Sequence, residues 1–311
     1  MNFLTMDYFT ALAEERNFTH AAMRLHITQQ TLSAHIAALE KEVGAPLFVR
    51  HVPLELTYAG QVFYRYAVAI QKDYRSLRQT LAGVTDQEIG EIRIGTAATR
   101  ERLILPDLLA AFQKQYPRIR FLLTEGSNLN LRQRLLDGQI DLAIALFGKS
   151  VPGLELHPFY KEKIVLVCPA SLWEKGAPEA GLRLETKAVS DTPAWRTFLQ
   201  QCPVLLNADT NIAGQTARRL FSRCGVQPDI RIESNNLETL LSLCVLGTGS
   251  MFSPDNLVAR LLQPGEARRV RIFGLPDASY TISFGCKRHR DRWIMLDKFM
   301  EFARKEMQPV V

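Results

Sequence analysis

The chain has 311 residues, which is more than one compact core usually holds, so two or three domains are expected. Hydrophobic residues make up 47% and charged residues 23%, as in globular proteins, and no apolar run approaches the ~20 residues that a membrane span needs. The net charge is +6, but residues 1–88 hold 8 Lys and Arg against 9 Asp and Glu (−1), and the remaining residues carry +7. Net charge alone therefore does not indicate nucleic-acid binding.

Three helices and a short hairpin are predicted near the N-terminus. The apolar positions of residues 4–15 fall near one face of a helix. Thr19 is placed as the N-cap of a helix over 20–25, and Thr28 as the N-cap of a helix over 29–43 that Gly44 ends. The β-prone residues 47–56, interrupted by a proline, predict a short hairpin or wing.

The second and third helices form a candidate DNA-reading unit. Two short helices joined by a tight turn let the second enter the major groove, which is about 12 Å wide. Small and apolar residues stand where these helices would cross, and the first turn of the third helix offers amides and hydroxyls to base edges and phosphates. The alternative is a helical hairpin whose polar residues are simply solvated. The predicted DNA-binding residues are Thr19, Thr28, Gln29, Gln30, Thr31, Ser33, His35 and, on the wing, Arg50.

A long helix is predicted after its N-cap, Thr57. Apolar residues recur along it at spacings of four and three, and the positions that face away from them are polar. This pattern favours a two-stranded coiled coil, and hence a homodimer, over the alternative of a single helix docked on its own domain. The predicted dimerisation residues are Phe63, Ala67, Ile70, Tyr74, Leu77, Leu81 and Val84.

Strands and helices alternate from residue 89 onward. A strand-helix-strand-helix-strand pattern covers residues 91–147, and a second block of this kind begins near Pro203. The order predicts two α/β lobes, joined by chain near 161–166 and again near 264–268. Strand-like residues 268–273 and 280–286 and an amphipathic helix complete the chain.

Polar side chains follow several of these strands. Ligands of two-lobed α/β domains bind in the crevice at the carboxyl ends of the strands, where hydroxyls beside helix N-termini suit an anion. Asp209 would oppose an anion there. The simpler interpretation is that these residues only cap helices. The predicted effector-binding residues are Thr96, Thr99, Ser127, Thr210 and Asn211.

Other chemistry finds less support in the sequence. The five cysteines form no C-x-x-C pair and have no histidine at zinc-ligand spacing, so buried thiols with no metal and no cofactor are expected. A redox pair of Cys202 and Cys224 is one alternative. An enzyme built on the lobes is another, but no G-x-S-x-G, P-loop, G-x-G-x-x-G or H-E-x-x-H motif is present. His157 and His289 are isolated and are expected to be surface or packing residues.

Residues 9–60, FTALAEERNFTHAAMRLHITQQTLSAHIAALEKEVGAPLFVRHVPLELTYAG, closely resemble the winged helix-turn-helix of LysR-type transcriptional regulators. The NFT-x-AA, L-x-I-T-Q, LF-x-R and LT-x-AG features match in order and spacing. The rest of the chain resembles the effector domain of this family, which looks like a periplasmic-binding-protein fold. The sequence departs from the family at Gln30, where proline is usual, at Ala34 and His35, and in a less basic wing. Fewer phosphate contacts predict a shallower salt dependence of DNA binding.

The resemblance implies a dimer of dimers on operator DNA and small organic acids or metabolites bound at positions matching Thr99 and Ser127. The predicted function is therefore a sequence-specific transcriptional regulator, not an enzyme, controlled by a small-molecule effector that is a small organic anion. The expected partners are double-stranded operator DNA, the effector, a second copy through the linker helix, a homotetramer, and RNA polymerase, with no membrane. The N-terminus has no signal-peptide pattern, so a cytoplasmic location is expected.

The expected organisation has three parts. Residues 1–58 form an all-α winged helix-turn-helix, and residues 59–88 form the linker and dimerisation helix. Residues 89–311 form a two-lobed α/β effector domain, with lobe I over 89–161 and 268–311 and lobe II over 162–267.

Overall fold

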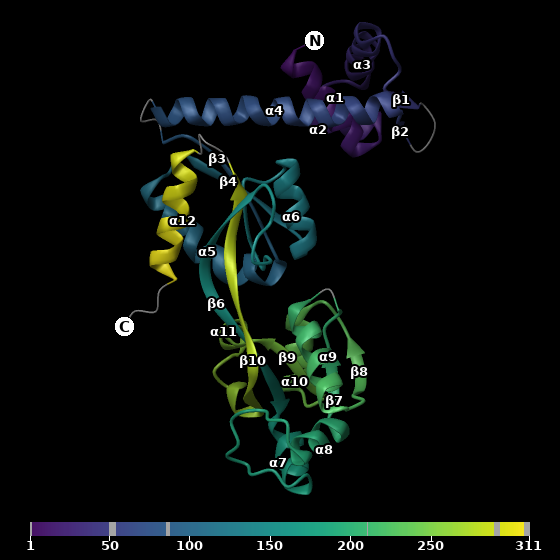
Figure 1. The fold of residues 1–311 in the computed structure, drawn as a ribbon. Helices are drawn as coiled ribbons and strands as arrows, with labels where there is room; N and C mark the ends of the chain where they lie inside the picture. The colour runs from purple at the N-terminus through teal and green to yellow at the C-terminus, as the bar shows by residue number, and fades with distance from the viewer. Residues whose placement is uncertain (1, 50–53, 85–87, 210, 289–292, 308–311) are drawn as a thin grey trace. The chain divides into compact units, whose positions relative to one another are not determined.

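The computed structural model describes residues 2–49, 54–84, 88–209, 211–288 and 293–307. The chain divides into two compact units (Figure 1). The first contains residues 1–90 with 136–139 and 289–298, and the second contains the rest.

The first unit contains a helix-turn-helix, a wing and a long helix. Its helices are α1 (Phe3–Glu15), α2 (Phe18–Arg24), α3 (Gln29–Val43) and α4 (Tyr58–Val84), and its strands are β1 (Phe48–Val49) and β2 (Glu55–Leu56). Phe9 and Leu12 of α1 and Leu32 and Ile36 of α3 recur at helical spacing and are fully buried in one core. The two strands pair antiparallel, so the predicted hairpin is present.

Single residues set the ends of α2 and α3. Asn17, rather than the predicted Thr19, is the N-cap of α2, because its side-chain oxygen accepts hydrogen bonds from the N–H groups of Thr19 (2.8 Å) and His20 (3.1 Å). Thr28 caps α3 as predicted and accepts from the Thr31 N–H at 3.1 Å. Gly44 ends α3 as predicted, with a left-handed φ of 75°.

The wing is tied to both α3 and α4. A carboxylate oxygen of Glu40 accepts the N–H of Leu47 at 2.8 Å. The Thr57 hydroxyl donates to the Pro46 carbonyl at 2.7 Å and accepts from the Gly60 N–H at 2.9 Å, so Thr57 caps α4 as predicted. A Cβ at Gly60 would lie 2.0 Å from the Leu47 carbonyl oxygen, so this close approach requires glycine.

One eight-stranded sheet runs through the second unit, in the order β4-β3-β5-β10-β6-β9-β7-β8. β3 and β5 are parallel, as are β7 and its neighbours β8 and β9, whereas β10 runs antiparallel to β5 and β6. Two parallel blocks, as predicted, thus flank an antiparallel centre. The strands are β3 (Gly90–Thr96), β4 (Ile119–Glu125), β5 (Leu142–Ala145), β6 (Leu154–Pro169), β7 (Pro203–Leu206), β8 (Asp229–Glu233), β9 (Ser250–Pro254) and β10 (Val270–Lys287).

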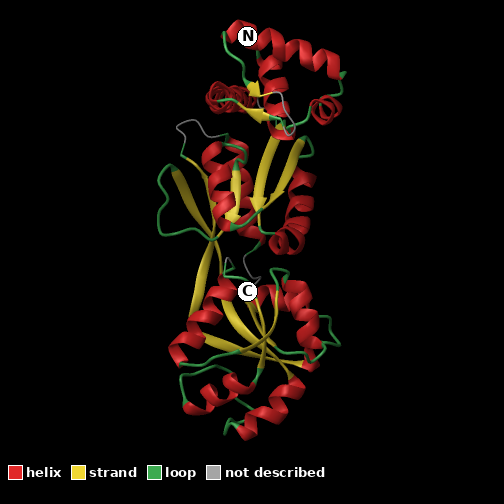
Figure 2. Cartoon of the chain, turned by 90° about the vertical axis from the view of Figure 1, so that its right-hand side faces the viewer, coloured by secondary structure: helices red, strands yellow, loops and turns green. Residues whose placement is uncertain are grey.

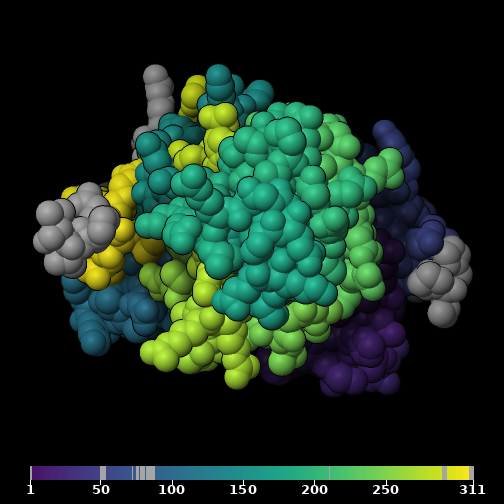
Figure 3. Space-filling view, turned by 90° about the horizontal axis from the view of Figure 1, so that it is seen from below, coloured from purple at the N-terminus to yellow at the C-terminus, as the bar shows by residue number. Residues whose placement is uncertain are grey.

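Helices cover the sheet in both lobes (Figure 2). They are α5 (Ala98–Gln115), α6 (Asn128–Asp137), α7 (Ala170–Glu179), α8 (Pro193–Gln201), α9 (Ile212–Cys224), α10 (Leu237–Val245), α11 (Asp255–Leu261) and α12 (Ile294–Glu306), with a 3-10 turn η1 (Ala267–Arg269). In lobe II, Trp173, Trp195 and Phe273 form a buried aromatic cluster under α7 and α8. In the space-filling view, the teal part of the chain that includes α7 and α8 faces the viewer (Figure 3).

The long strands β6 and β10 belong to both lobes. Residues 270–274 of β10 pair with 165–169 of β6 beside β9, and residues 279–287 pair with 154–163 near β5. The chain therefore returns to lobe I inside β10, at the register shift between Gly274 and Ser279, which is later than the predicted crossing near 264–268. The two strand-like segments predicted over 268–273 and 280–286 belong to the single strand β10. The residues between them have no strand-like pattern, so the sequence did not predict one continuous strand.

Among the helices that the structure describes, none is both long and apolar enough to cross a membrane.

Candidate functional site

The first turn of α3 presents amides and a hydroxyl to solvent. Gln29, Gln30 and Thr31 are exposed, and Ser33 is half-buried. The Thr19 hydroxyl lies 3.3 Å from Oε1 of Gln29, so α2 restrains the glutamine side chain at the start of α3. A glutamine held in this way can bond an adenine edge through its amide.

Two other predicted DNA-binding residues, Thr28 and His35, make contacts within their own unit. The Thr28 hydroxyl caps α3 and lies 2.8 Å from the Thr31 hydroxyl, so both hydroxyls take part in the structure of the helix start. His35 is half-buried and packs edge-on against Tyr8 of α1, with ring centroids 4.9 Å apart. Its ring therefore supports the α1–α3 contact. Arg50 lies outside the described residues.

The apolar stripe of α4 changes role along its length. Phe63 packs edge-on against Phe9, with ring centroids 4.7 Å apart, and Ala67 is 2% exposed, so these two residues belong to the core of their own unit. From Ile70 the stripe is exposed, although the Tyr74 ring also stacks on Phe3 of α1, with ring centroids 4.0 Å apart. The exposed fractions are 38% for Ile70, 41% for Tyr74, 53% for Leu77 and 55% for Leu81, while the side chain of Val84 lies outside the described set.

A cavity of about 470 Å³ lies between the lobes of the second unit. Thr99, Ser127 and Asn211, all predicted from the sequence, line it. Thr96 does not, contrary to expectation: it is 1% exposed, and its hydroxyl donates to the Ile144 carbonyl at 2.9 Å, which ties β3 to β5. Thr210 lies outside the described residues.

Several helix N-termini open onto this cavity. Its lining includes the first residues of α5 and α9 and residues at the starts of α6, α10 and α11. Asn211 caps α9 by accepting from the Ala213 N–H at 2.8 Å, and Ser127 accepts from the Asn130 N–H at 3.3 Å. The N-cap of α5 is Ala97, which has no side-chain acceptor, so the first-turn N–H groups of α5 have no side-chain cap. Such N–H groups, with the helix dipole, attract an anion.

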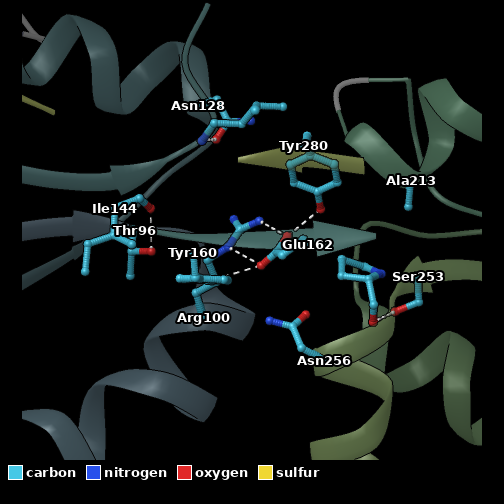
Figure 4. A network of polar contacts seen from close by, with 12 residues as sticks. Thr96, Arg100, Asn128, Ile144, Tyr160, Glu162, Ala213, Ser253, Asn256 and Tyr280 are labelled. Carbon is cyan, nitrogen blue, oxygen red and sulfur yellow. Dashed lines mark hydrogen bonds and ion pairs between the residues drawn. The ribbon is translucent and has the colours of Figure 1, made fainter. Parts of the chain in front are cut away.

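Beside the cavity, a buried ion pair joins Arg100 of the cavity lining to Glu162 of β6. Nη2 of Arg100, in the first turn of α5, lies 2.8 Å from Oε2 of Glu162 on β6, and its Nε lies 3.1 Å from Oε1 (Figure 4). Glu162 is 0% exposed. The Tyr160 hydroxyl donates to Oε1 at 2.9 Å, and the Tyr280 hydroxyl of β10 donates to Oε2. Four donors therefore satisfy one carboxylate.

This network keeps Glu162 ionised. Burial on its own would raise the pKa of the Glu162 carboxyl, but the charge and hydrogen bonds of Arg100, with the two tyrosine hydroxyls, hold that pKa below its ordinary value. Burial raises the pKa of Tyr160 and of Tyr280, so both stay protonated as donors. Because Glu162 balances the charge of Arg100, the arginine adds no net positive charge to the cavity, and Glu125 in the lining adds a negative one.

Arg100 and Glu162 were not predicted as site residues from the sequence. They are 62 positions apart, and Glu162 stands between two lysines in a strand, a context typical of a solvated face. Its carboxylate is buried because β6 and β10 pair with each other where they pass between the lobes. The single available signal was the position of Arg100 directly after Thr99, at the start of the helix that follows β3.

The two cysteines of the suggested redox pair have different neighbours. Sγ of Cys202 lies 3.4 Å from the Ser250 hydroxyl and is a neighbour of the Cys168 thiol, whereas Cys224 has Asp191 as a neighbour. All five cysteines are buried and form no disulfide bond. The suggested redox pair of Cys202 and Cys224 stays a prediction.

Two family models match the chain. Residues 4–61 match the bacterial regulatory helix-turn-helix protein, lysR family, and residues 85–308 match the LysR substrate binding domain. The second match alone spans more than half of the chain.

Relatives and solved structures agree with these matches. The chain is 28% identical over 315 residues to the uncharacterized HTH-type transcriptional regulator YcgK of Bacillus subtilis, which covers 99% of this chain and 95% of that protein. It is 27% identical over 270 residues to the HTH-type transcriptional activator IlvY of Salmonella typhimurium, covering 86% and 87%. The crystal structure of full-length CbnR complexed with its target DNA aligns with a TM-score of 0.65 and 24% identity, over 98% of this chain and 99% of that chain.

Proposed function

Because the chain belongs to the LysR family of transcriptional regulators, we propose a ligand class for its cavity and a way in which it binds its operator. The chain is a DNA-binding regulator rather than an enzyme, and a small-molecule effector controls it through the C-terminal domain. We assign DNA binding to residues 1–58, the linker helix to 59–88 and effector binding to 89–311.

The effector is a small organic anion with one carboxylate. The observation that supports this class is the start of α5, where the first turn faces the cavity without a side-chain cap and Thr99 adds a hydroxyl. Ser127 and Asn211 line the cavity from α6 and α9, so one ligand could touch both lobes. Glu125 in the same lining would repel a second negative charge, so a monoanion or an amino acid is favoured over a dicarboxylate.

Control of DNA binding requires that the effector bind two arrangements of the protein with different affinity. Both lobes contribute to the cavity lining, so a bound effector favours whichever lobe arrangement brings the two sets of groups to the correct distance. The strands β6 and β10, which join the lobes beside Glu162, are the elements that would bend.

The operator is read by the first turn of α3. Gln29 and Gln30 are proposed to contact bases, Thr31 and Ser33 to contact bases or phosphates, and the hydroxyl of Thr19 to hold Gln29 in place. Arg50 on the wing remains a proposed minor-groove contact. His35 is better assigned to the support of α3, because it packs on Tyr8.

The exposed part of the α4 stripe is proposed as the dimer contact. It comprises Ile70, Leu77 and Leu81, together with Tyr74, whose ring also stacks on Phe3 of its own unit. Phe63 and Ala67 are buried in their own unit. Two copies place two α3 helices on two half-sites, and two such dimers would form the tetramer. CbnR was crystallised on its target DNA, in keeping with this mode of action. Contact with RNA polymerase is a further part of the proposal.

A thermal-shift screen of the full-length chain against monocarboxylates, amino acids and dicarboxylates tests the ligand class. Binding to the native state raises the melting temperature with ligand concentration. A monocarboxylate hit should lose its shift in Thr99→Val and keep it in Thr197→Val, which changes an exposed threonine of α8 outside the cavity. Glu125→Gln should improve dicarboxylate binding. An unchanged shift in Thr99→Val, or hits confined to uncharged compounds, would overturn the assignment.

A further inference from the structure

Three metal-ligand side chains lie on one face of the paired strands β6 and β10. Glu155 and His157 are two residues apart on β6, so their side chains point to the same face. Cys286 of β10 pairs directly with Glu155, and Phe284 pairs with His157, which puts Cys286 on that face too. The antiparallel register therefore brings together a carboxylate, an imidazole and a thiol, although Glu155 and Cys286 are 131 positions apart in the chain.

The donor atoms of these residues are close enough for one ion. They all lie within 4.8 Å of one another, and Nε2 of His157 is 3.7 Å from Oε2 of Glu155. Metal–ligand bonds of about 2.0–2.3 Å in a tetrahedron separate the donor atoms by roughly 3.3–3.8 Å. Small rotations of these side chains would close the remaining difference. Within the described part of the chain, no other group of three such side chains meets at this distance.

We propose that Glu155, His157 and Cys286 form a binding site for a divalent transition-metal ion of the Zn²⁺ class. A mixed set of sulfur, nitrogen and oxygen donors suits Zn²⁺ and Co²⁺ and does not suit Mg²⁺ or Ca²⁺, which prefer oxygen. Three protein ligands leave a fourth position for water. Neither the effector cavity nor the DNA-reading helix contains these residues, so the site is independent of the function proposed above.

The surroundings allow an ion to enter. The side chains of Glu155 and His157 are 31% and 30% exposed, whereas Cys286 is 1% exposed, so two ligands face solvent and the thiol closes the inner side. Glu155 and His157 also line a hollow of about 600 Å³ together with Arg288. Nε of Arg288 lies 4.0 Å from Oε1 of Glu155, and its side chain is 75% exposed. An exposed ion pair of this kind contributes little, so a metal ion can displace the guanidinium.

Metal binding would clip together the lobe I ends of the two strands that connect the lobes. Leu154 and Lys287 pair at the end of this ladder, one residue beyond Glu155 and Cys286. An ion that binds only the folded chain stabilises it in proportion to its concentration. The same cross-link would restrain β6 against β10.

A Co²⁺ titration of the metal-free, reduced full-length protein tests the site. A thiolate-to-cobalt charge-transfer band in the near ultraviolet should rise to saturation at one equivalent, and added Zn²⁺ should abolish it. The band should vanish in Cys286→Ser and remain in Cys224→Ser, which changes another buried cysteine away from the site. His157→Gln and Glu155→Gln alter partly exposed residues and should each weaken Co²⁺ binding at least tenfold.

The two partly exposed variants keep the test decisive if Cys286→Ser fails to fold. A wild-type protein without the band would overturn the proposal. So would a band that persists in folded Cys286→Ser, or Co²⁺ affinities of His157→Gln and Glu155→Gln equal to that of the wild type.

Discussion

Polar side chains play opposite roles in the α2–α3 pair (residues 17–44) and in the strand crossing formed by Arg100, Tyr160, Glu162 and Tyr280. In the α2–α3 pair most of them are exposed, and those that form bonds bond mostly to near neighbours in the chain. In the strand crossing Arg100 and Glu162 are buried, and two of the partners of Glu162 are 62 and 118 positions away. The first arrangement leaves polar groups for a partner molecule, and the second directs four donors to one internal carboxylate. Substitutions should therefore have small effects on stability in one region and large effects in the other.

The largest expected effect is that of Glu162→Gln. Removing the carboxylate leaves the buried guanidinium of Arg100 without a counter-charge, and such a loss costs about 3–5 kcal/mol. Urea unfolding of the full-length variant, monitored by circular dichroism, measures the change. Arg100→Met should cost a similar amount. The double variant Arg100→Met with Glu162→Leu should be less destabilised than the sum of the two single variants.

The pH dependence of this effect has a definite sign. The pKa of Glu162 is lowered in the folded state relative to its ordinary value of 4.5, so its stabilising contribution is present above about pH 4.5 and is lost as the pH falls through the folded-state pKa. The difference in unfolding free energy between the wild type and Glu162→Gln should therefore shrink below pH 4.5. A difference that stays constant or grows in acid would show that the ion pair does not stabilise the fold.

Gly60 and Gly44 test whether a close contact with distant backbone makes a position sensitive to substitution. Gly60→Ala adds a Cβ that would meet the Leu47 carbonyl oxygen at 2.0 Å, and a backbone atom cannot rotate away. The strain should cost roughly 3 kcal/mol. Gly44→Ala is the control, because its Cβ meets nothing within 4 Å and the cost is the left-handed φ, about 1 kcal/mol. Equal melting temperatures of the two variants would contradict this ranking.

The same contrast explains which features the sequence could predict. The α2–α3 pair was predicted almost completely because its determinants lie within a few residues: the caps Thr28 and Gly44 were correct. The cap of α2 was assigned to Thr19 instead of Asn17 because both residues are good caps and stand two positions apart. Such an error moves a helix start without changing the fold.

The effector domain was predicted in outline but not at its centre. Thr99, Ser127 and Asn211 follow from the rule that ligands bind at the carboxyl ends of parallel strands. The pairing of Arg100 with Glu162 depends on where the paired strands β6 and β10 pass from one lobe to the other. A pattern along the chain does not contain that information. For the apolar stripe of α4, the sequence could not separate core residues from dimer-contact residues. An apolar residue such as Phe63 has the same spacing whether it packs within its unit or against a second copy.

In the α2–α3 pair, Gln29→Ala should change binding much more than stability. Gln29 is exposed, so the free energy of unfolding should change by less than about 0.5 kcal/mol. Loss of a bidentate base contact should reduce discrimination between operator and unrelated DNA by about 1–2 kcal/mol. Fluorescence anisotropy with both DNAs over a range of salt concentrations measures this. The slope of affinity against salt should stay as in the wild type, because no phosphate contact is lost. Equal losses on both DNAs would assign Gln29 to the backbone instead.

The smallest expected effect distinguishes Asn17 from Thr19. The side chain of Asn17 satisfies two N–H groups at the start of α2, so Asn17→Ala should lower stability by about 1 kcal/mol. Thr19→Ala removes only the hydroxyl that lies 3.3 Å from Gln29 and should leave stability nearly unchanged. Its effect should appear instead as weaker operator discrimination, because Gln29 loses its restraint. Paired melting and anisotropy measurements on the two variants separate a residue that builds the helix from one that positions its reader. If Thr19→Ala were the more destabilising change, the cap of α2 would have to be reassigned to the threonine.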